Sequence, residues 1–168
     1  MLEGKYTRRL SAKDLLTLGA LFELKAAKFY RFMAKYFEKD PQFKEMMIRF
    51  AQDDLKNGQS FKKMMLHLEE NPNIYIDEAD YQHMRMLMPE HFIAMDLDHP
   101  EMISPKDALY GVLKFEEVAL NFGKNLMLEN QGINRALRPT LELVEMIRAE
   151  ERHLGQVKDY FHRHYPAA

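Results

Sequence analysis

Four acidic residues lie on the apolar faces of segments with helical periodicity, and each needs a partner if its segment is buried. These residues are Glu23, Asp54, Glu116 and Glu150. The positions three, four and seven residues away share a helix face with each acid, and they carry almost only apolar or small side chains. The polar exceptions are Asn57 beside Asp54 and His153 beside Glu150. An unpaired carboxylate in an apolar interior is very costly, so each acid must be protonated, paired or bound to a cation. None of these faces contains Lys or Arg, and a metal ion is therefore the simplest counter-charge.

The apolar periodicity predicts an all-α fold in a single domain over residues 1–168. Start signals support the helices: Ser11 with Asp14 forms a capping box, and Asp40 precedes a proline at the first helical position. The four expected long helices cover residues 11–39, 41–70, 104–130 and 139–164. The segment 71–103 is expected to cross from one end of the bundle to the other, with a short helix over 77–87. The fold class predicted is an antiparallel four-helix bundle with one long crossover between its second and third helices.

Composition excludes several classes of function. The net charge is −2 and no basic cluster occurs, so no nucleic-acid partner is expected. The absence of cysteine excludes disulfides, thiol nucleophiles, iron–sulfur ligation and thiolate zinc sites. The first ten residues are too polar for a signal-peptide core, and no apolar run reaches 18 residues. We therefore expect a cytoplasmic protein without a membrane partner.

The inward acids repeat between the two halves of the chain. In each half the first acid precedes a phenylalanine by six positions, and the second precedes a potential ligand by three, Asn57 in one half and His153 in the other. The two acids are 31 residues apart in the first half and 34 in the second. Duplicated helical hairpins would place all four acids at one level of the core.

One inward acid on each of two helices, with an acid-x-x-ligand pair on each of the other two, is the arrangement of ferritin-like di-iron carboxylate proteins. The chain resembles that superfamily, and within it the rubrerythrin-like proteins, over about residues 11–164. The motifs that carry the resemblance are Glu23-x5-Phe-Tyr, Phe50-Ala-Gln-Asp-Asp-Leu-Lys-Asn57, Glu116-x5-Phe and Ala149-Glu-Glu-Arg-His-Leu154.

The resemblance implies a ligand set. Glu23 and Glu116 would be terminal ligands, Asp54 and Glu150 would bridge two metal ions, and His153 would complete one metal site. The metal implied is iron, as two ions or one, with zinc as an alternative. The resemblance also implies a homodimer. Rubrerythrin-like proteins often carry a rubredoxin domain with four cysteines, and since this chain has none, it would need an external electron donor.

Two positions depart from the family pattern. Asn57 stands where the second histidine ligand is expected, and its neutral amide is a poorer ligand for iron or zinc than imidazole. Asp54 stands where the family usually has Glu, and the shorter carboxylate spans two metals less easily. The departures affect the half of the site that contains Glu23, whereas the half with Glu116, Glu150 and His153 is intact.

Two hypotheses of function follow. In the first, a carboxylate-bridged di-iron centre reduces peroxide or dioxygen, as a peroxide reductase or ferroxidase does. In the second, the bundle is non-catalytic or vestigial, with a single metal ion at Glu116, Glu150 and His153 or with its acids protonated. Tyr30 is either a core tyrosine or a hydrogen-bond partner of a ligand. The histidines of the crossover, His83, His91 and His99, show no repeated ligand spacing and are expected at the surface.

Overall fold

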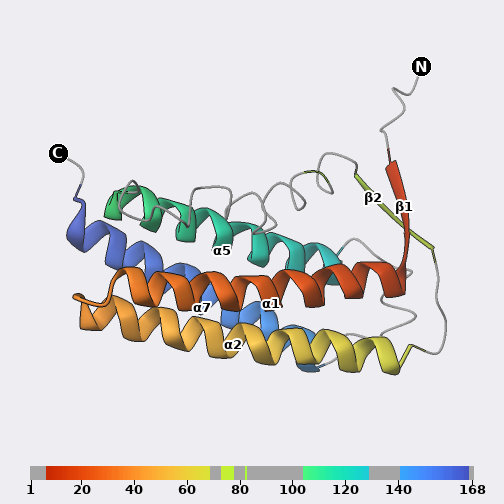
Figure 1. Cartoon of the computed structure of the whole chain (residues 1–168). Coiled ribbons are helices and arrows are strands. Elements are labelled where there is room, and N and C mark those ends of the chain that lie inside the picture. The colour runs from red at the N-terminus through yellow and green to blue at the C-terminus, as the bar shows by residue number, and fades with distance from the viewer. Residues whose placement is uncertain (1–6, 69–72, 78–81, 83–103, 129–140, 167–168) are drawn as a thin grey trace, which may run out of the picture.

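Four long helices make up most of the part of the chain that the computed structural model describes, which is residues 7–68, 73–77, 82, 104–128 and 141–166. The helices are α1 (Ala12–Tyr36), α2 (Pro41–Leu66), α5 (Pro105–Leu128) and α7 (Leu141–His164). They lie side by side along one direction, and α1 and α2 run in opposite directions (Figure 1). The predicted helical bundle is confirmed at this level. No helix in the described residues is both long enough and apolar enough to span a membrane.

Helices α1, α2 and α5 begin where their local start signals indicate. At α1 the Ser11 hydroxyl accepts a hydrogen bond from the Asp14 N–H at 3.1 Å, and the Asp14 carboxylate accepts from the Ser11 N–H at 3.3 Å. Asp40 caps α2 by accepting from the Phe43 N–H at 3.0 Å. Ser104 caps α5 by accepting a backbone N–H three residues on. The ends differ more from expectation, because α1 and α2 stop three and four residues before the predicted ends at 39 and 70.

A short antiparallel sheet, which the sequence analysis did not predict, joins the start of α1 to the segment after α2. Strand β1 (Thr7–Ser11) pairs with β2 (Asn73–Asp77), with Thr7 opposite Asp77 and Ser11 opposite Asn73. Residues 73–77 of the expected crossover are therefore extended. The β-branched and aromatic run Ile-Tyr-Ile in β2 suits a strand, but its partner lies more than 60 residues away and is not evident from local periodicity. Of the short helix expected over 77–87, the structure describes two residues, Asp77, which ends β2, and Gln82, which is helical. The remaining residues of the crossover lie outside the described part of the chain.

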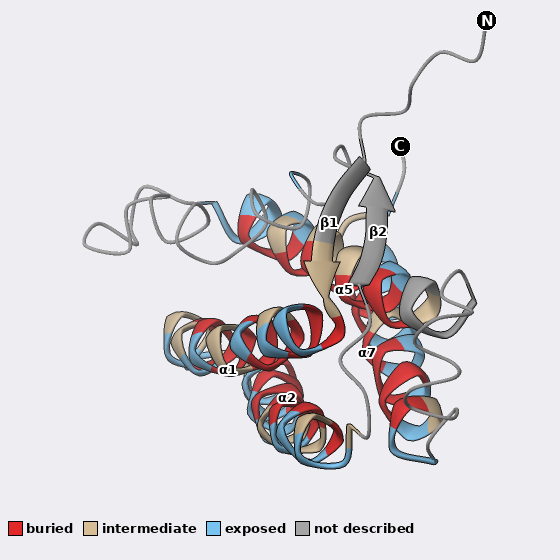
Figure 2. Ribbon diagram, turned by 90° about the vertical axis from the view of Figure 1, so that its right-hand side faces the viewer, coloured by how far each residue is buried: buried red, intermediate tan, exposed pale blue. Residues whose placement is uncertain are grey.

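The apolar faces of all four helices turn inward, as the buried positions in Figure 2 show. Aromatic rings fill the space between α1 and α5, where Phe22 and Phe115 stack with ring centroids 4.6 Å apart. Tyr30 is fully buried and packs edge-on against Phe50 of α2 and against Phe115. These rings form one side of the space in which the buried acids meet.

Gly19 allows α1 and α2 to approach closely at one end of the bundle. A Cβ atom at this position would lie 2.7 Å from the ring of Phe61 and 3.0 Å from that of Phe122. Both rings are buried, so neither can move aside without disturbing the core. Gly155 in α7 is the opposite case, because a Cβ there would meet nothing within 4 Å.

We therefore expect Gly19→Ala to destabilise the protein and Gly155→Ala to stabilise it. Alanine gains about 1 kcal/mol over glycine inside a helix, but overpacking a core costs about 1–3 kcal/mol, which outweighs that gain at position 19. Urea unfolding of the two variants measures the difference. Equal free energies of unfolding for both variants would contradict the close packing at Gly19.

Candidate metal centre

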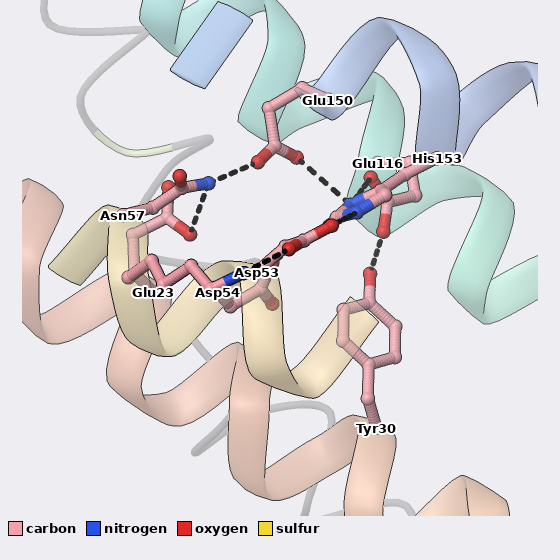
Figure 3. A network of polar contacts seen from close by, with 9 residues as sticks. Glu23, Tyr30, Asp53, Asp54, Asn57, Glu116, Glu150 and His153 are labelled. Atoms are coloured by element: carbon pink, nitrogen blue, oxygen red, sulfur yellow. Dashed lines mark hydrogen bonds and ion pairs between the residues drawn. The ribbon is translucent and has the colours of Figure 1, made fainter. Parts of the chain in front are cut away.

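Six polar or charged side chains are buried in the described part of the chain, and they form one cluster in the middle of the bundle (Figure 3). Each has an exposed fraction of 7% or less. Every helix contributes at least one of them. They are Glu23 from α1, Asp54 and Asn57 from α2, Glu116 from α5, and Glu150 and His153 from α7. The structure thus brings together all the residues that the sequence analysis assigned to one site.

His153 lies at the centre of this cluster. Its Nδ1 atom is 3.5 Å from Glu116 Oε2, 3.9 Å from Asp54 Oδ1 and 3.9 Å from Glu150 Oε2. Both His153 Nδ1 and Glu116 Oε2 are buried without a hydrogen-bond partner. A buried polar atom without a partner is costly, so this spot suits a bound proton or a cation that several atoms share.

The other ring nitrogen of His153 faces Asp53, a residue that the sequence analysis missed. His153 Nε2 is 3.3 Å from Asp53 Oδ2, and the ring stacks on Phe50 with centroids 4.0 Å apart. Histidines that bind metals commonly donate their second N–H to a carboxylate, which fixes the ring and its tautomer. Asp53 directly precedes Asp54 in the sequence. The tendency of histidine ligands to pair with a carboxylate could have suggested Asp53 as a partner of His153.

Tyr30 fixes the carboxylate of Glu116 from the opposite side. Its buried hydroxyl donates a hydrogen bond to Glu116 Oε1, while Oε2 of the same carboxylate faces His153. Tyr30 is therefore both a core aromatic residue and a hydrogen-bond partner of a candidate ligand, which combines the two alternatives that the sequence left open.

Asn57 connects the two remaining glutamates. Its amide Nδ2 donates a hydrogen bond to Glu150 Oε1 at 2.8 Å and lies 3.5 Å from Glu23 Oε2. The side chain thus presents N–H groups to the acids, and a neutral donor occupies the place where a second imidazole was expected. Helix α2 continues past Asn57 to Leu66.

Burial shifts the protonation of the acids strongly. Desolvation and the neighbouring charge of Glu116 raise the pKa of Glu23 from 4.5 to about 8, although the Asn57 amide opposes the shift. Desolvation and the adjacent carboxylates also hold the pKa values of Asp54 and Glu150 well above the ordinary range. In the absence of another cation, the cluster therefore retains protons at neutral pH.

The imidazole is the local cation that the chain itself provides. Burial lowers the pKa of His153, but the carboxylates of Asp53 and Glu116 overcome this effect and raise it to about 9. The hydrogen bond from His153 and the nearby Lys56 ammonium in turn lower the pKa of Asp53 to about 2. One imidazolium cannot balance four buried carboxyl groups, so protons or a metal ion must supply the remainder.

The donor set fits a metal ion. Asp54, Glu150 and His153 each offer one ligand atom, and these three atoms lie within 4.8 Å of one another. Carboxylate oxygen and imidazole nitrogen are suitable ligands for iron and zinc. Glu116, with its unpartnered oxygen 3.5 Å from His153 Nδ1, lies next to this group.

Comparisons with family models, curated proteins and solved structures find no match to this chain. The metal, the di-iron chemistry and the family therefore stay predictions. The histidines His83, His91 and His99 lie outside the described residues.

After metal removal, we expect the free energy of unfolding to decrease as the pH rises from about 5 to about 8. The pKa of Glu23 is about 8 in the folded protein against 4.5 ordinarily, so the folded state holds a proton that the unfolded state releases in this interval. Stability is therefore lost as pH rises towards the folded pKa, with a slope of about 1.4 kcal/mol per pH unit for each such proton. Urea unfolding at a series of pH values measures the slope.

Two variants serve as controls for this slope. The Gln side chain in Glu23→Gln cannot titrate. The free energy of unfolding of this variant should therefore fall less steeply with pH, by the contribution of roughly one proton. Glu117→Gln alters a glutamate that pairs with Lys114 at 2.8 Å near the surface, and it should retain the parent slope. If Glu23→Gln keeps the full slope, Glu23 is not protonated in the folded protein.

Proposed function

We propose that this chain is a ferritin-like, rubrerythrin-like metal protein that binds iron at the buried acids and reduces peroxide or dioxygen. The observation that carries the proposal is the pair of unpartnered buried atoms, His153 Nδ1 and Glu116 Oε2, within a group of four carboxyl groups. The ferritin-like arrangement is supported by the contribution of one inward acid from each helix. It is also supported by Figure 1, in which α2 ends and α5 begins at opposite ends of the bundle, as a long crossover requires.

In this proposal, Asp54, Glu150 and His153 hold the first ion, with Glu116 beside them. Asp53 keeps the proton of His153 on Nε2, so that the lone pair of Nδ1 points into the cluster. Tyr30 occupies one oxygen of Glu116 and leaves the other for the ion. The Phe50 ring stacks on one face of the His153 imidazole, with ring centroids 4.0 Å apart.

Bound iron would supply the one-electron redox couple. Reduction of hydrogen peroxide to two water molecules consumes two electrons and two protons. The buried carboxyl groups with raised pKa values, such as Glu23, can hold protons close to the reaction. The electrons come from an external donor, because the chain has no cysteine from which to build a rubredoxin-like centre. The homodimer implied by the family resemblance stays a prediction.

A second candidate function is a vestigial bundle, and the contacts of Asn57 favour it. The amide donates to Glu150 and lies near Glu23, so it stabilises these acids without a second metal ion. In that case a single ion, or protons alone, would neutralise the cluster. Addition of peroxide or dioxygen to the ferrous protein, followed optically, separates the candidates: rapid oxidation supports redox function, and unchanged spectra support the vestigial bundle.

The number of metal ions per chain tests the proposal most directly. We expect protein loaded anaerobically with Fe²⁺ to retain at least one ion per chain, and His153→Ala to retain almost none. Removal of a ligand should cost more than the roughly 10–100-fold affinity loss that follows from changing a residue hydrogen-bonded to a ligand. His67→Ala removes an exposed histidine at the end of α2 and should bind like the parent. Elemental analysis after gel filtration measures the content. A metal-free parent would refute the metal proposal.

The residue at position 57 should limit how much iron binds in the half of the site that contains Glu23. Asn57→His replaces a hydrogen-bond donor by an imidazole ligand one turn after Asp54, so we expect its iron content to rise towards two per chain. Asn57→His combined with Asp54→Glu should raise the content further, because the longer carboxylate reaches two ions more easily. Asn57→Gln, which keeps the amide, is the control and should not gain iron. Two ions already present in the parent would show that Asn57 does not limit the site.

A further inference from the structure

A pocket of about 400 Å³ opens between α2 and α7 next to the buried cluster. A water molecule takes up about 30 Å³ in the liquid, so this volume holds several small polar molecules. Helix α2 and helix α7 each provide part of the wall. The lining residues are Asp53, Lys56, Asn57 and Ser60 from α2, and Glu142, Glu145, Met146, Arg148, Ala149 and Arg152 from α7.

Two of the lining residues also belong to the polar network of the cluster. Asp53 contacts His153 Nε2 at 3.3 Å, and Asn57 donates to Glu150 at 2.8 Å. Asp53 is partly exposed, whereas Asn57 has an exposed fraction of 7%. Asp53 and Asn57 therefore line the pocket and also contact candidate ligands of the buried cluster.

The charges around the pocket balance. Three lining residues are acidic and three are basic. At least one opposite pair is joined, since Lys56 Nζ lies 3.2 Å from Asp53 Oδ1. The wall also includes the buried apolar side chains of Met146 and Ala149 and the neutral polar groups of Asn57 and Ser60. Such a wall offers hydrogen bonds but no net charge to compensate an ion that loses its hydration.

We infer that this pocket is the vestibule through which small uncharged polar molecules reach the buried acids, in preference to ions of similar size. Its role as a substrate passage depends on the proposed function, and hydrogen peroxide has the size and polarity that the vestibule admits. Asn57 stands at its inner end, where the amide can exchange a hydrogen bond with an incoming molecule. The vestibule itself is a property of the protein chain and exists without metal.

Cysteine labelling of the full-length, metal-free protein tests the vestibule. The chain has no cysteine, so a single introduced thiol is unique. Ala149 lines the pocket and Ala119 of α5 does not, yet both are helical alanines with an exposed fraction of 6%. We expect uncharged methyl methanethiosulfonate to modify Ala149→Cys about tenfold faster than Ala119→Cys, after each rate is divided by that of the same variant in urea. Equal rates would overturn the inference.

Charged reagents test whether the vestibule prefers uncharged molecules, and a bulky substitution in its wall tests where the access route lies. The trimethylammonium and sulfonate analogues of the reagent should both modify Ala149→Cys more slowly than the uncharged reagent, and equal rates would overturn the preference for uncharged molecules. Ser60→Trp should fill the vestibule and slow the modification, whereas Gln59→Trp, on the exposed neighbouring residue, should not. If Ser60→Trp does not slow the modification of Ala149→Cys, the access route lies elsewhere.

If circular dichroism shows that Ala149→Cys or Ala119→Cys does not fold, a second pair of variants provides the same comparison. Asn57→Cys at the inner end should react faster than Ala51→Cys, which is buried on the same helix away from the pocket. The outcomes are distinguishable from those for the proposed function. If the protein binds no metal but is labelled selectively, the vestibule is supported and the metal proposal is refuted. If it binds iron but is not labelled selectively, the metal proposal is supported and the vestibule is refuted.

Discussion

The burial of four carboxyl groups around one imidazole is the constraint on which the rest of the structure depends. Every helix contributes one of the acids, so their mutual repulsion acts directly on helix packing. Protons or a metal ion must neutralise them before the bundle can close. A cation bound at this site would contact acids from several helices, so its binding would be thermodynamically linked to folding.

The sequence predicted the helices and the inward direction of the acids because both are local properties. Helical periodicity places Glu116 on an apolar face, and capping residues such as Ser11 mark the starts. The sheet between β1 and β2 was not predicted, since its pairing joins distant segments. Asp53 and the vestibule were missed for a similar reason, because they depend on how α2 and α7 lie against each other and not on the pattern within either helix.

The cluster is asymmetric, and the asymmetry follows the departure at position 57. Around His153, Asp53 contacts Nε2, the Phe50 ring stacks on the imidazole, and Tyr30 donates a hydrogen bond to Glu116. On the other side, a neutral amide donates to Glu150 and lies near Glu23. A centre built in this way should hold one ion in an oriented site, whereas a second ion would have to displace the hydrogen bonds of Asn57.

Asn57 also separates the cluster from the vestibule, and this position explains how one residue can affect both binding and access. An imidazole at position 57 would add a ligand but would remove the amide that an incoming molecule meets at the inner end of the pocket. Asn57 therefore lies at the boundary between the pocket and the buried cluster, so a substitution there changes the pocket wall and the ligand set together.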